Sequence, residues 1–327
     1  MPMLDWIQVE ITSRCNASCL YCPRTAYRDH WPGRDLSRNL TEALAPYFAT
    51  TGMVHLQGWG EPLLHGGFFE MIGLAKKAGC RVTTATNGML LDRKMAARLV
   101  ASGIDDVAFS LAAIGEGNDE IRRGTSFAAV LAAIDSIASA KKERCSATPV
   151  VGIAYMLLRS QASSLPEIVP ALANRGIENI IISTLDFVPS RSLKSEQILP
   201  KNEAEYQEWK SKLDRLVDEG KRTGLTVHYH LARPGRSNRT CTENIGRTLV
   251  VAADGGVSPC VFTNIPASRA TQPVEVREKT WQRLSFGNLS DESLSSIWRS
   301  EPYASFRRSL RKTPHPRCRS CLKLIMD

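Results

Sequence analysis

Residues 15–22 read CNASCLYC and follow directly after an apolar segment at residues 6–11. That segment has the length and composition of a buried strand, so Cys15, Cys19 and Cys22 are expected in the loop at its carboxyl end. In barrel enzymes this end of the strands carries the chemistry. Closed zinc and 4Fe–4S sites take four protein ligands, so three closely spaced thiolates leave one metal position open. The stretch therefore indicates a reactive metal site after the first strand.

The sequence outside this loop alternates short apolar runs with longer helical patterns, which predicts βα units and a parallel sheet. Strands are expected at residues 6–11, 53–57, 81–85, 106–111, 149–157 and 179–184. Helices are expected at residues 68–78, 93–101, 127–141 and 165–174, three of them followed by a glycine suited to a helix C-cap. Six such units predict an α/β fold, a partial (β/α)6 TIM-like barrel.

The pattern changes after residue 188. Residues 203–222 predict a charged helix and residues 225–230 a strand, and a hairpin is expected at 249–253 and 257–261 around an Asp-Gly-Gly turn. A short helix is expected at 294–299. We therefore predict three parts, which are a barrel at 1–188, a linking helix and strand at 189–232, and a cysteine-rich module at 233–327.

The composition excludes several classes of protein. The 327 residues include 42 Lys and Arg against 33 Asp and Glu, a net charge of +9, with 43% hydrophobic residues. No run of eighteen apolar residues occurs, so neither a membrane span nor membrane association is expected. The start of the chain lacks the pattern of a secretory signal, which predicts a cytoplasmic protein. The basic residues are scattered and no nucleic-acid-binding motif accompanies them, so no nucleic-acid partner is expected.

A reducing cytoplasm makes clustered cysteines a sign of metal or redox sites rather than of disulfides. Four of the nine cysteines form a second group near the end of the chain, here called the C-terminal cysteine set: Cys241, Cys260, Cys318 and Cys321. Four ligands complete a site, and both zinc and an electron-transfer iron–sulfur cluster accept four cysteines. The spacing leaves these two alternatives open. The remaining Cys80 and Cys145 are expected at the amino ends of strands.

The loop at residues 15–22, here called the N-terminal cysteine loop, resembles the cluster-binding motif of radical S-adenosylmethionine (SAM) enzymes. The aromatic Tyr21 before the third cysteine is part of this resemblance, which covers about residues 5–185. It implies a 4Fe–4S cluster on Cys15, Cys19 and Cys22, with SAM on the fourth iron. It also implies reductive cleavage of SAM to methionine and a 5′-deoxyadenosyl radical that abstracts a hydrogen atom from the substrate.

Later elements resemble the SAM-binding parts of that family. Gly58-Trp59-Gly60-Glu61-Pro62 is similar to its Gly-Gly-Glu element and implies that Glu61 receives the SAM amino group, although Trp59 replaces the usual first glycine. Arg123 is the expected partner of the SAM carboxylate, with Arg122 as an ambiguous neighbour, because a guanidinium can clamp a carboxylate with two hydrogen bonds. The complete set of implied SAM-binding residues is Tyr21, Gly58, Gly60, Glu61, Asn87, Ser110, Arg123, Gly152 and Ile153.

The sequence around the C-terminal cysteine set, including Ser258-Pro259-Cys260 and Cys318-Arg319-Ser320-Cys321, resembles the SPASM/twitch extension of radical SAM enzymes. The resemblance implies that the set holds an auxiliary 4Fe–4S cluster. Full SPASM domains carry seven cysteines, and this sequence ends six residues after Cys321. One auxiliary cluster is therefore expected, as in the twitch-type enzyme 2-deoxy-scyllo-inosamine dehydrogenase, whose cysteine spacing is similar.

A closed second cluster favours an electron acceptor, so the leading prediction is a dehydrogenase that removes a hydrogen atom, a proton and an electron from its substrate. A redox-neutral epimerase and a maturase for a peptide, a protein or a cofactor are the alternatives. An iron–sulfur or zinc protein without activity would leave the open metal position unexplained. The expected partners are a small-molecule or peptide substrate and a flavodoxin-type or ferredoxin-type reductant. Only five residues precede residue 6, so no leader-binding module is expected.

The sequence leaves the catalytic residue unassigned. The candidates follow the fifth and sixth strands or precede the cysteine-rich module, and they are Arg159, Asp186, His228, Tyr229 and His230. Each also fits a plain structural role, because an Arg or Asp at a strand end often forms a surface ion pair and a strand His often packs. His55 and His65 flank the Glu61 segment, and we expect both to be structural.

Overall fold

The computed structural model describes residues 4–235, 241–266, 283–309, 314–316, 318–319 and 321–324, and it divides the chain into two compact units. Unit 1 comprises residues 1–15, 23–84 and 238–324, and unit 2 comprises residues 16–22, 85–237 and 325–327. Both units therefore combine segments that are far apart in the sequence.

Unit 1 is built on strands that pair in the order β3-β2-β1-β8-β9. Their bounds are β1 (Leu4–Val9), β2 (Thr51–Leu56), β3 (Arg81–Thr86), β8 (Thr248–Val251) and β9 (Val257–Ser258), and the last two residues of β3 belong to unit 2. β1 pairs in parallel with both β2 and β8, so that Val9 lies opposite Leu56 and Val251. The carboxyl end of β8 therefore lies beside the carboxyl end of β1.

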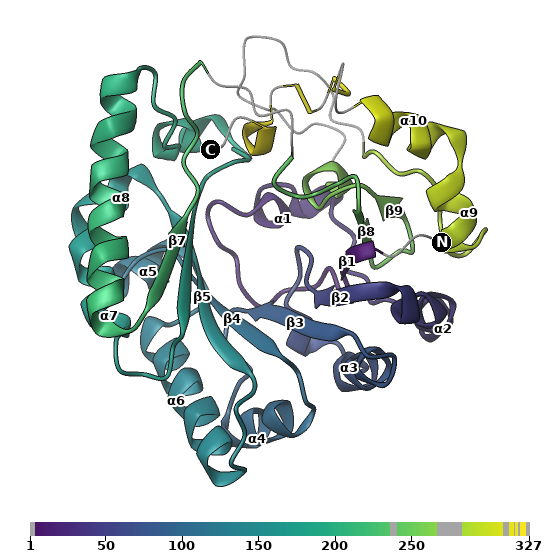
Figure 1. Cartoon of the computed structure of the whole chain (residues 1–327), viewed down its shortest axis with the longest axis horizontal. Coiled ribbons are helices and arrows are strands. Elements are labelled where there is room, and N and C mark those ends of the chain that lie inside the picture. The colour runs from purple at the N-terminus through teal and green to yellow at the C-terminus, as the bar shows by residue number, and fades with distance from the viewer. Residues whose placement is uncertain are drawn as a thin grey trace. The chain divides into compact units, whose positions relative to one another are not determined.

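The helices of unit 1 are short. They are α1 (Pro23–Ala26), α2 (Arg38–Leu44), α3 (Phe68–Lys77), α9 (Leu294–Arg299) and α10 (Glu301–Ser309), with 3₁₀ turns η1 (Arg28–His30), η2 (Ala45–Thr50), η3 (Pro62–Leu64), η6 (Phe262–Asn264) and η7 (Leu322–Leu324). Ser37 begins α2 and Ser293 begins α9, each with a side chain that accepts a hydrogen bond from an amide three residues later. α9 and α10 follow each other directly (Figure 1).

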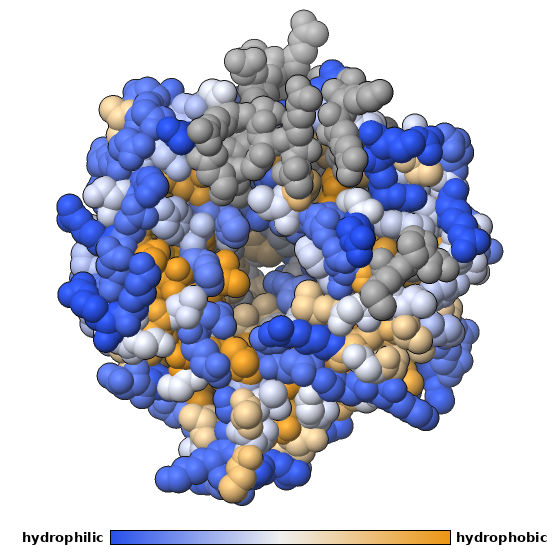
Figure 2. Space-filling view, viewed as in Figure 1, coloured by the Kyte–Doolittle hydropathy of each residue, from blue (hydrophilic) through white to orange (hydrophobic). Residues whose placement is uncertain are grey.

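Unit 2 holds parallel strands in the order β4-β5-β6-β7. Their bounds are β4 (Asp106–Leu111), β5 (Val150–Leu157), β6 (Asn179–Thr184) and β7 (Thr226–Tyr229). The helices are α4 (Arg93–Ala101), α5 (Glu116–Ile121), α6 (Phe127–Glu143), α7 (Ile168–Leu172) and α8 (Glu203–Thr223), with 3₁₀ turns η4 (Arg159–Glu167) and η5 (Arg191–Glu196). α8 lies along β7 (Figure 1), and its outer surface is largely hydrophilic (Figure 2).

Most of the expected elements are present. The strands expected at 106–111 and 179–184 are confirmed to the residue, and the other four expected strands are present within a few residues. The single helix expected at 165–174 is wrong, because η4 and the five-residue α7 replace it. Pro166 and Pro170 lack the amide hydrogen that a continuous helix needs. The second hairpin strand is only two residues long, and α10 was not expected.

The strand β1 presents different residues to its two faces, as the alternation along a strand requires. Ile7 and Val9 are fully buried hydrophobic residues. Gln8 and Glu10 alternate with them and are also buried, at 8% and 5% exposure. In the described ranges, no helix is both long and apolar enough to cross a membrane.

Candidate functional site

The part of the N-terminal cysteine loop that belongs to unit 2 is held by the segment after α5. The amide of Ser18 donates to the carbonyl oxygen of Arg123 at 2.7 Å, and the amide of Leu20 donates to that of Ile121 at 2.9 Å. Two backbone hydrogen bonds of this kind fix the direction of the loop. The chain itself therefore shapes this part of the loop.

Asn87 and Gly124 add to this support. The side-chain amide of Asn87, at the end of β3, donates to the side-chain oxygen of Asn16 at 2.7 Å. Gly124 has a positive φ of +84°, and a Cβ at this position would lie 3.0 Å from the Asn16 carbonyl oxygen. Glycine tolerates both the conformation and the close approach. Asn87 thus braces the loop, whereas contact between Asn87 and SAM stays a prediction.

Arg122 is the buried cation beside this loop. It is 7% exposed, its guanidinium donates to the hydroxyl of Tyr21, and it lies 5.9 Å from the centroid of the Tyr21 ring. Burial raises the pKa of the Tyr21 hydroxyl, which therefore stays protonated, while the charge of Arg122 opposes that rise. The charge of Arg122 also acts on the thiols of Cys19 and Cys22. Its neighbour Arg123, the expected partner of the SAM carboxylate, is exposed.

Within unit 1, backbone carbonyl groups leading to Cys15 are held by residues from other segments. The guanidinium of Arg24 donates to the carbonyl oxygens of Ser13 and Cys15, at 2.9 and 3.3 Å. The amide of Glu61 donates to the carbonyl oxygen of Arg14 at 2.8 Å. The path of the chain into the first cysteine is therefore tied to the Glu61 segment.

Close backbone packing explains the glycines of that segment. A Cβ at Gly60 would lie 2.1 Å from the carbonyl oxygen of Thr12, and one at Gly58 would lie 2.2 Å from Cγ of Glu10. Any larger residue would push the segment away from β1. Glu61 itself is 3% exposed, and its carboxylate accepts a hydrogen bond from the amide two residues later. The segment is compact enough to present Glu61 in one position.

Both histidines near this segment make structural contacts. His65 accepts a hydrogen bond from the amide of Gly67 at 3.0 Å, and its other ring nitrogen lies 3.1 Å from the carbonyl oxygen of Leu36. His55 on β2 lies 2.6 Å from the hydroxyl of Thr83 on β3. These contacts fit the structural role expected for both.

The two remaining cysteines lie outside both cysteine groups. Cys80 precedes β3 and is buried, and its thiol donates to the carbonyl oxygens of Phe48 and Thr51 at 3.0 and 3.1 Å. Cys145 follows α6 and is exposed. Cys80 thus serves packing, and Cys145 is a free surface thiol.

The other implied SAM-binding residues lie on β4 and β5. Ser110 is half-buried on β4, and Gly152 and Ile153 lie on the paired strand β5. A Cβ at Gly152 would lie 2.5 Å from the side-chain oxygen of Asn179 on β6. Gly152 therefore has a packing reason to be glycine, and SAM binding by these three residues stays a prediction.

The five candidate catalytic residues lie in unit 2, and two of them contact α8. The guanidinium of Arg159 lies 5.6 Å from the ring of Trp209, and the hydroxyl of Tyr229 donates to Asp214 at 2.6 Å. The other three candidates are exposed or half-buried in or beside β6 and β7, namely Asp186, His228 and His230. Arg159 and Tyr229 therefore have structural partners, and none of the five stands out as catalytic.

The C-terminal cysteine set lines one cavity. All four cysteines border a space of about 450 Å³ within unit 1, together with Phe262, Thr263 and other residues. Burial raises the pKa of the Cys241 thiol to about 12. Burial also raises the pKa of Cys321, and the other three thiols of the set raise it further. The four cysteines therefore border one space, and their binding of one metal group stays a prediction.

Backbone and charged groups join two of the segments that carry these cysteines. The amide of Thr242 donates to the carbonyl oxygen of Lys323 at 3.2 Å, and the Lys323 ammonium lies 3.2 Å from the Glu243 carboxylate. Cys260 lies 3.5 Å from the hydroxyl of Thr263. Within the part of the chain that the structure describes, no three His, Cys, Asp or Glu side chains are grouped so as to hold a single metal ion.

Sequence reasoning missed three residues near the end of β1. Glu10 is buried there, Arg24 holds the carbonyl groups before Cys15, and Arg34 lies in the segment before α2. The sequence pattern could have marked Glu10, since a charged residue alternates there with apolar strand residues. No sequence pattern marks Arg24 or Arg34, because their surroundings depend on how loops pack.

Comparisons with known proteins agree with this arrangement. Residues 9–156 match the model of the radical SAM superfamily, and residues 241–322 match that of SPASM, described as an iron–sulfur cluster-binding domain. These ranges contain both cysteine groups.

Several relatives match nearly the whole chain. A tungsten-containing aldehyde ferredoxin oxidoreductase cofactor-modifying protein from Pyrococcus furiosus is 27% identical, covering 97% of this chain and 87% of its own. A PqqA peptide cyclase from Gluconobacter oxydans is 24% identical, covering 97% and 82%. The crystal structure of Streptococcus suis SuiB bound to S-adenosylmethionine matches 99% of this chain and 72% of its own, with a TM-score of 0.69 at 13% identity. The last likeness supports the fold class, a mostly parallel α/β partial barrel.

Proposed function

Since the chain is a radical SAM enzyme with a C-terminal SPASM domain, we propose that it is a maturase, which modifies a cofactor precursor or a peptide by radical chemistry. The observation that carries this proposal is the match along nearly the whole chain to two proteins named for such modifications, one of a cofactor and one of a peptide. Of the dehydrogenase predicted from the sequence, we keep the expectation that the reaction is an oxidation.

The two domains imply a SAM-binding 4Fe–4S cluster and auxiliary iron–sulfur chemistry. We assign the first cluster to Cys15, Cys19 and Cys22, and one auxiliary cluster to the C-terminal cysteine set. The four thiols around one cavity fit a cluster. A single zinc ion would hold its thiolates about 4 Å apart, given zinc–sulfur bonds of about 2.3 Å. The match to an iron–sulfur cluster-binding domain favours the cluster over zinc.

The chain's own residues prepare the first site. When bound, the SAM-binding cluster and SAM would together supply the radical chemistry that modifies the precursor. Arg24 and the Glu61 amide hold the chain before Cys15, and Asn87 braces the loop through Asn16. Buried Glu61 is assigned to the SAM amino group. The assignment of the remaining SAM contacts stays as predicted from the sequence.

We further propose that the modification is an oxidation. A site closed by four cysteines offers no position for substrate, so its fitting role is electron transfer. An oxidation removes two hydrogen atoms from the precursor in total, whereas an epimerisation removes none. The three parts predicted from the sequence, with bounds at residues 188 and 232, remain our proposal for the domains.

Fractionated cell extract tests this function. The anaerobically reconstituted enzyme, with SAM and a reductant, is incubated with a small-molecule fraction and with a peptide fraction, and 5′-deoxyadenosine is measured. We expect one fraction to stimulate its formation and to yield a product lighter by two hydrogen atoms. A product whose mass is unchanged in ordinary water, and which gains deuterium when the reaction is run in heavy water, would contradict oxidation and support an epimerase. Stimulation by neither fraction would contradict the maturase.

A further inference from the structure

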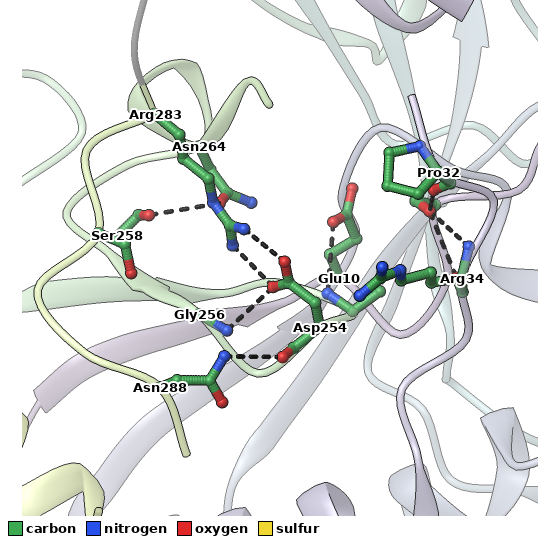
Figure 3. A network of polar contacts seen from close by, with 12 residues as sticks. Glu10, Pro32, Arg34, Asp254, Gly256, Ser258, Asn264, Arg283 and Asn288 are labelled. Atoms are coloured by element: carbon green, nitrogen blue, oxygen red, sulfur yellow. Dashed lines mark hydrogen bonds and ion pairs between the residues drawn. The ribbon is translucent and has the colours of Figure 1, made fainter. Parts of the chain in front are cut away.

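A second cavity lies in unit 1, beside the carboxyl ends of β1 and β8. It measures about 300 Å³ with its open mouth, and we call it the Arg34 hollow. Residues from three segments that are distant in sequence border it, among them Glu10, Ser13, Trp31, Arg34, Asp254 and Arg283. Figure 3 shows several of them turned toward one another. Because this space includes the open mouth, the hollow suits one functional group of a larger molecule rather than a whole ligand.

One charged pair on the wall of the hollow is self-contained. Arg283 donates two hydrogen bonds to the carboxylate of Asp254, at 2.5 and 2.8 Å, and a third to the side-chain oxygen of Asn264 at 2.6 Å. Asp254 also accepts a hydrogen bond from the amide of Gly256 at 3.0 Å. These two charges compensate each other, so the pair forms a rigid wall.

Glu10 connects the hollow to the Glu61 segment. Its carboxylate is 5% exposed and accepts hydrogen bonds from the amides of Trp59 and Ala253, at 2.8 and 3.4 Å. Burial raises the pKa of this carboxyl group. Trp59 lies two residues before Glu61, and its ring contacts that of Trp31, with centroids 6.1 Å apart. A ligand in the hollow would thus lie beside the residues that shape the assigned SAM site.

Arg34 has a fixed backbone and an available side chain. Its amide donates to the Ser13 hydroxyl at 2.9 Å, and its carbonyl oxygen accepts from the Ser13 amide at 2.8 Å. Figure 3 shows its side chain reaching toward Glu10 and Asp254. Across the described ranges, its exposed guanidinium has no hydrogen-bond partner within bonding distance, and its charge helps to lower the pKa of Asp254. A guanidinium offers five N–H donors in a planar fork.

We propose that the Arg34 hollow binds a carboxylate group of the precursor, with Arg34 as its anchor. This inference rests on the proposed function and adds a substrate class to it. A planar carboxylate matches the guanidinium fork with two parallel hydrogen bonds. The carboxylate of Glu10 lies in the same hollow and repels a doubly charged phosphate more strongly than a singly charged carboxylate. Trp31 gives the attached carbon skeleton an apolar surface.

Ligand-observed NMR titration of the anaerobic holoenzyme tests this site. Benzoate serves as the non-peptide probe and acetyl-alanyl-alanine as the peptide probe, with methyl benzoate and the peptide amide as uncharged controls. We expect at least one carboxylate to bind, and its uncharged control not to bind. Comparing the two probes identifies whether a peptide or another molecule supplies the carboxylate.

Arg34→Gln is expected to weaken binding of the carboxylate about tenfold or more, because it removes the charged donor. Arg34→Lys, which keeps the charge without the fork, is expected to weaken it less. Arg38→Gln is the matched control, since Arg38 is an exposed arginine that pairs with Glu42 on α2. Binding that Arg34→Gln leaves unchanged, equal binding of the uncharged controls, tighter binding of phenyl phosphate, or no carboxylate binding would each overturn the proposal.

A separate measurement distinguishes failure of this proposal from failure of the proposed function. Formation of 5′-deoxyadenosine from SAM under reduction is measured in the wild-type holoenzyme without any probe. No deoxyadenosine would overturn the radical function, while the titration would still decide whether the hollow binds carboxylates. If deoxyadenosine forms but no carboxylate binds, the proposed radical function stands, and only the proposal for the Arg34 hollow is overturned.

Discussion

The two cysteine groups of this chain are built in opposite ways. The N-terminal loop carries its three cysteines within residues 15–22, and in unit 2 it has its own backbone hydrogen bonds to the segment after α5. The C-terminal set draws its four cysteines from separate segments between residues 241 and 321, which meet around one cavity. The chain therefore shapes the first site locally. The second site depends on bringing distant segments together.

This difference has a thermodynamic consequence. A metal group that joins distant segments contributes its binding free energy to folding. A metal group on a loop already held by the chain contributes less to the fold and is available for reaction. We therefore expect removal of metal to affect structure mainly at the C-terminal set, and to affect chemistry mainly at the N-terminal loop.

The largest effect is expected from Cys318→Ser combined with Cys321→Ser. Removing two of four ligands should release roughly four irons. It should also increase hydrogen exchange in residues 241–266, because the metal no longer joins the segments. Iron analysis and exchange measured by mass spectrometry check both results. Cys145→Ser is the control, since Cys145 is an exposed cysteine outside both groups. Unchanged exchange in the double variant would show that the cavity holds its shape without metal.

Glu61→Ala tests whether the N-terminal site is the one that binds SAM. Loss of the charged partner assigned to the SAM amino group should raise the KM for SAM about tenfold or more, since a hydrogen bond to a charged group contributes roughly 1.5–3 kcal/mol. Deoxyadenosine formation at varied SAM concentration measures it. Glu61→Gln keeps the side-chain oxygen that accepts the amide hydrogen bond. Its KM for SAM should lie between those of the wild type and of Glu61→Ala. An unchanged KM in both variants would remove Glu61 from the SAM site.

Tyr21→Phe tests how the chain supports its own loop. Arg122 is buried, and its Nε has no hydrogen-bond partner among the described residues, so loss of the Tyr21 hydroxyl leaves it further unsatisfied. The free energy of unfolding should fall by about 1–3 kcal/mol. Urea denaturation of the reconstituted protein measures this change. The exposed Arg123→Gln serves as the control and should change stability by less than about 0.5 kcal/mol. Equal stability of Tyr21→Phe and wild type would contradict the supporting role.

Asn87→Ala should have a smaller effect on the same loop. It removes the hydrogen bond to Asn16 and the one that Asn87 accepts from the Met89 amide. We expect a loss of about 1 kcal/mol, together with faster exchange of the amides of Ser18 and Leu20. Exchange that stays at the wild-type rate would mean that the backbone hydrogen bonds hold the loop by themselves.

The smallest effect is expected from acid titration of Asp254 in unit 1. Burial alone would raise the pKa of Asp254, but hydrogen bonds and the charge of Arg283 outweigh it and lower the pKa. A lowered pKa stabilises the fold above the unfolded value of about 3.9, and the stabilisation is lost as the pH falls below it. Asp254→Asn should therefore lose stability less steeply than wild type between about pH 4 and pH 3. Parallel curves for the two proteins would contradict this role of the pair.

The comparison also explains how far the sequence alone could predict the fold and the site. β4, β6 and α4 were predicted to the residue, because the period of the apolar residues is a local signal. The helix at 165–174 was wrong, since its two prolines outweighed an apolar pattern. The pairing of β8 with β1 was not predicted, because a strand's own sequence does not name its partner.

The same distinction holds for the candidate site. The N-terminal cysteine loop was predicted as a metal site from the spacing of its cysteines. That the C-terminal set forms one site was predicted from the number and type of its ligands. The contact between Tyr21 and Arg122 was missed, because two adjacent arginines look alike in sequence and only packing decides which is buried. Arg34 was missed because the packing of its loop, rather than its sequence, brings it to the hollow.

The central claim is that both cysteine groups hold iron–sulfur clusters and that only the N-terminal loop supports cleavage of SAM. The most direct measurement is anaerobic reconstitution of the wild type and of the Cys15→Ala/Cys19→Ala/Cys22→Ala variant, with iron analysis, EPR and a deoxyadenosine assay. We expect about eight irons in the wild type, about four in the variant, and deoxyadenosine only from the wild type. Deoxyadenosine from the triple variant, or about four irons and one zinc in the wild type, would contradict the claim.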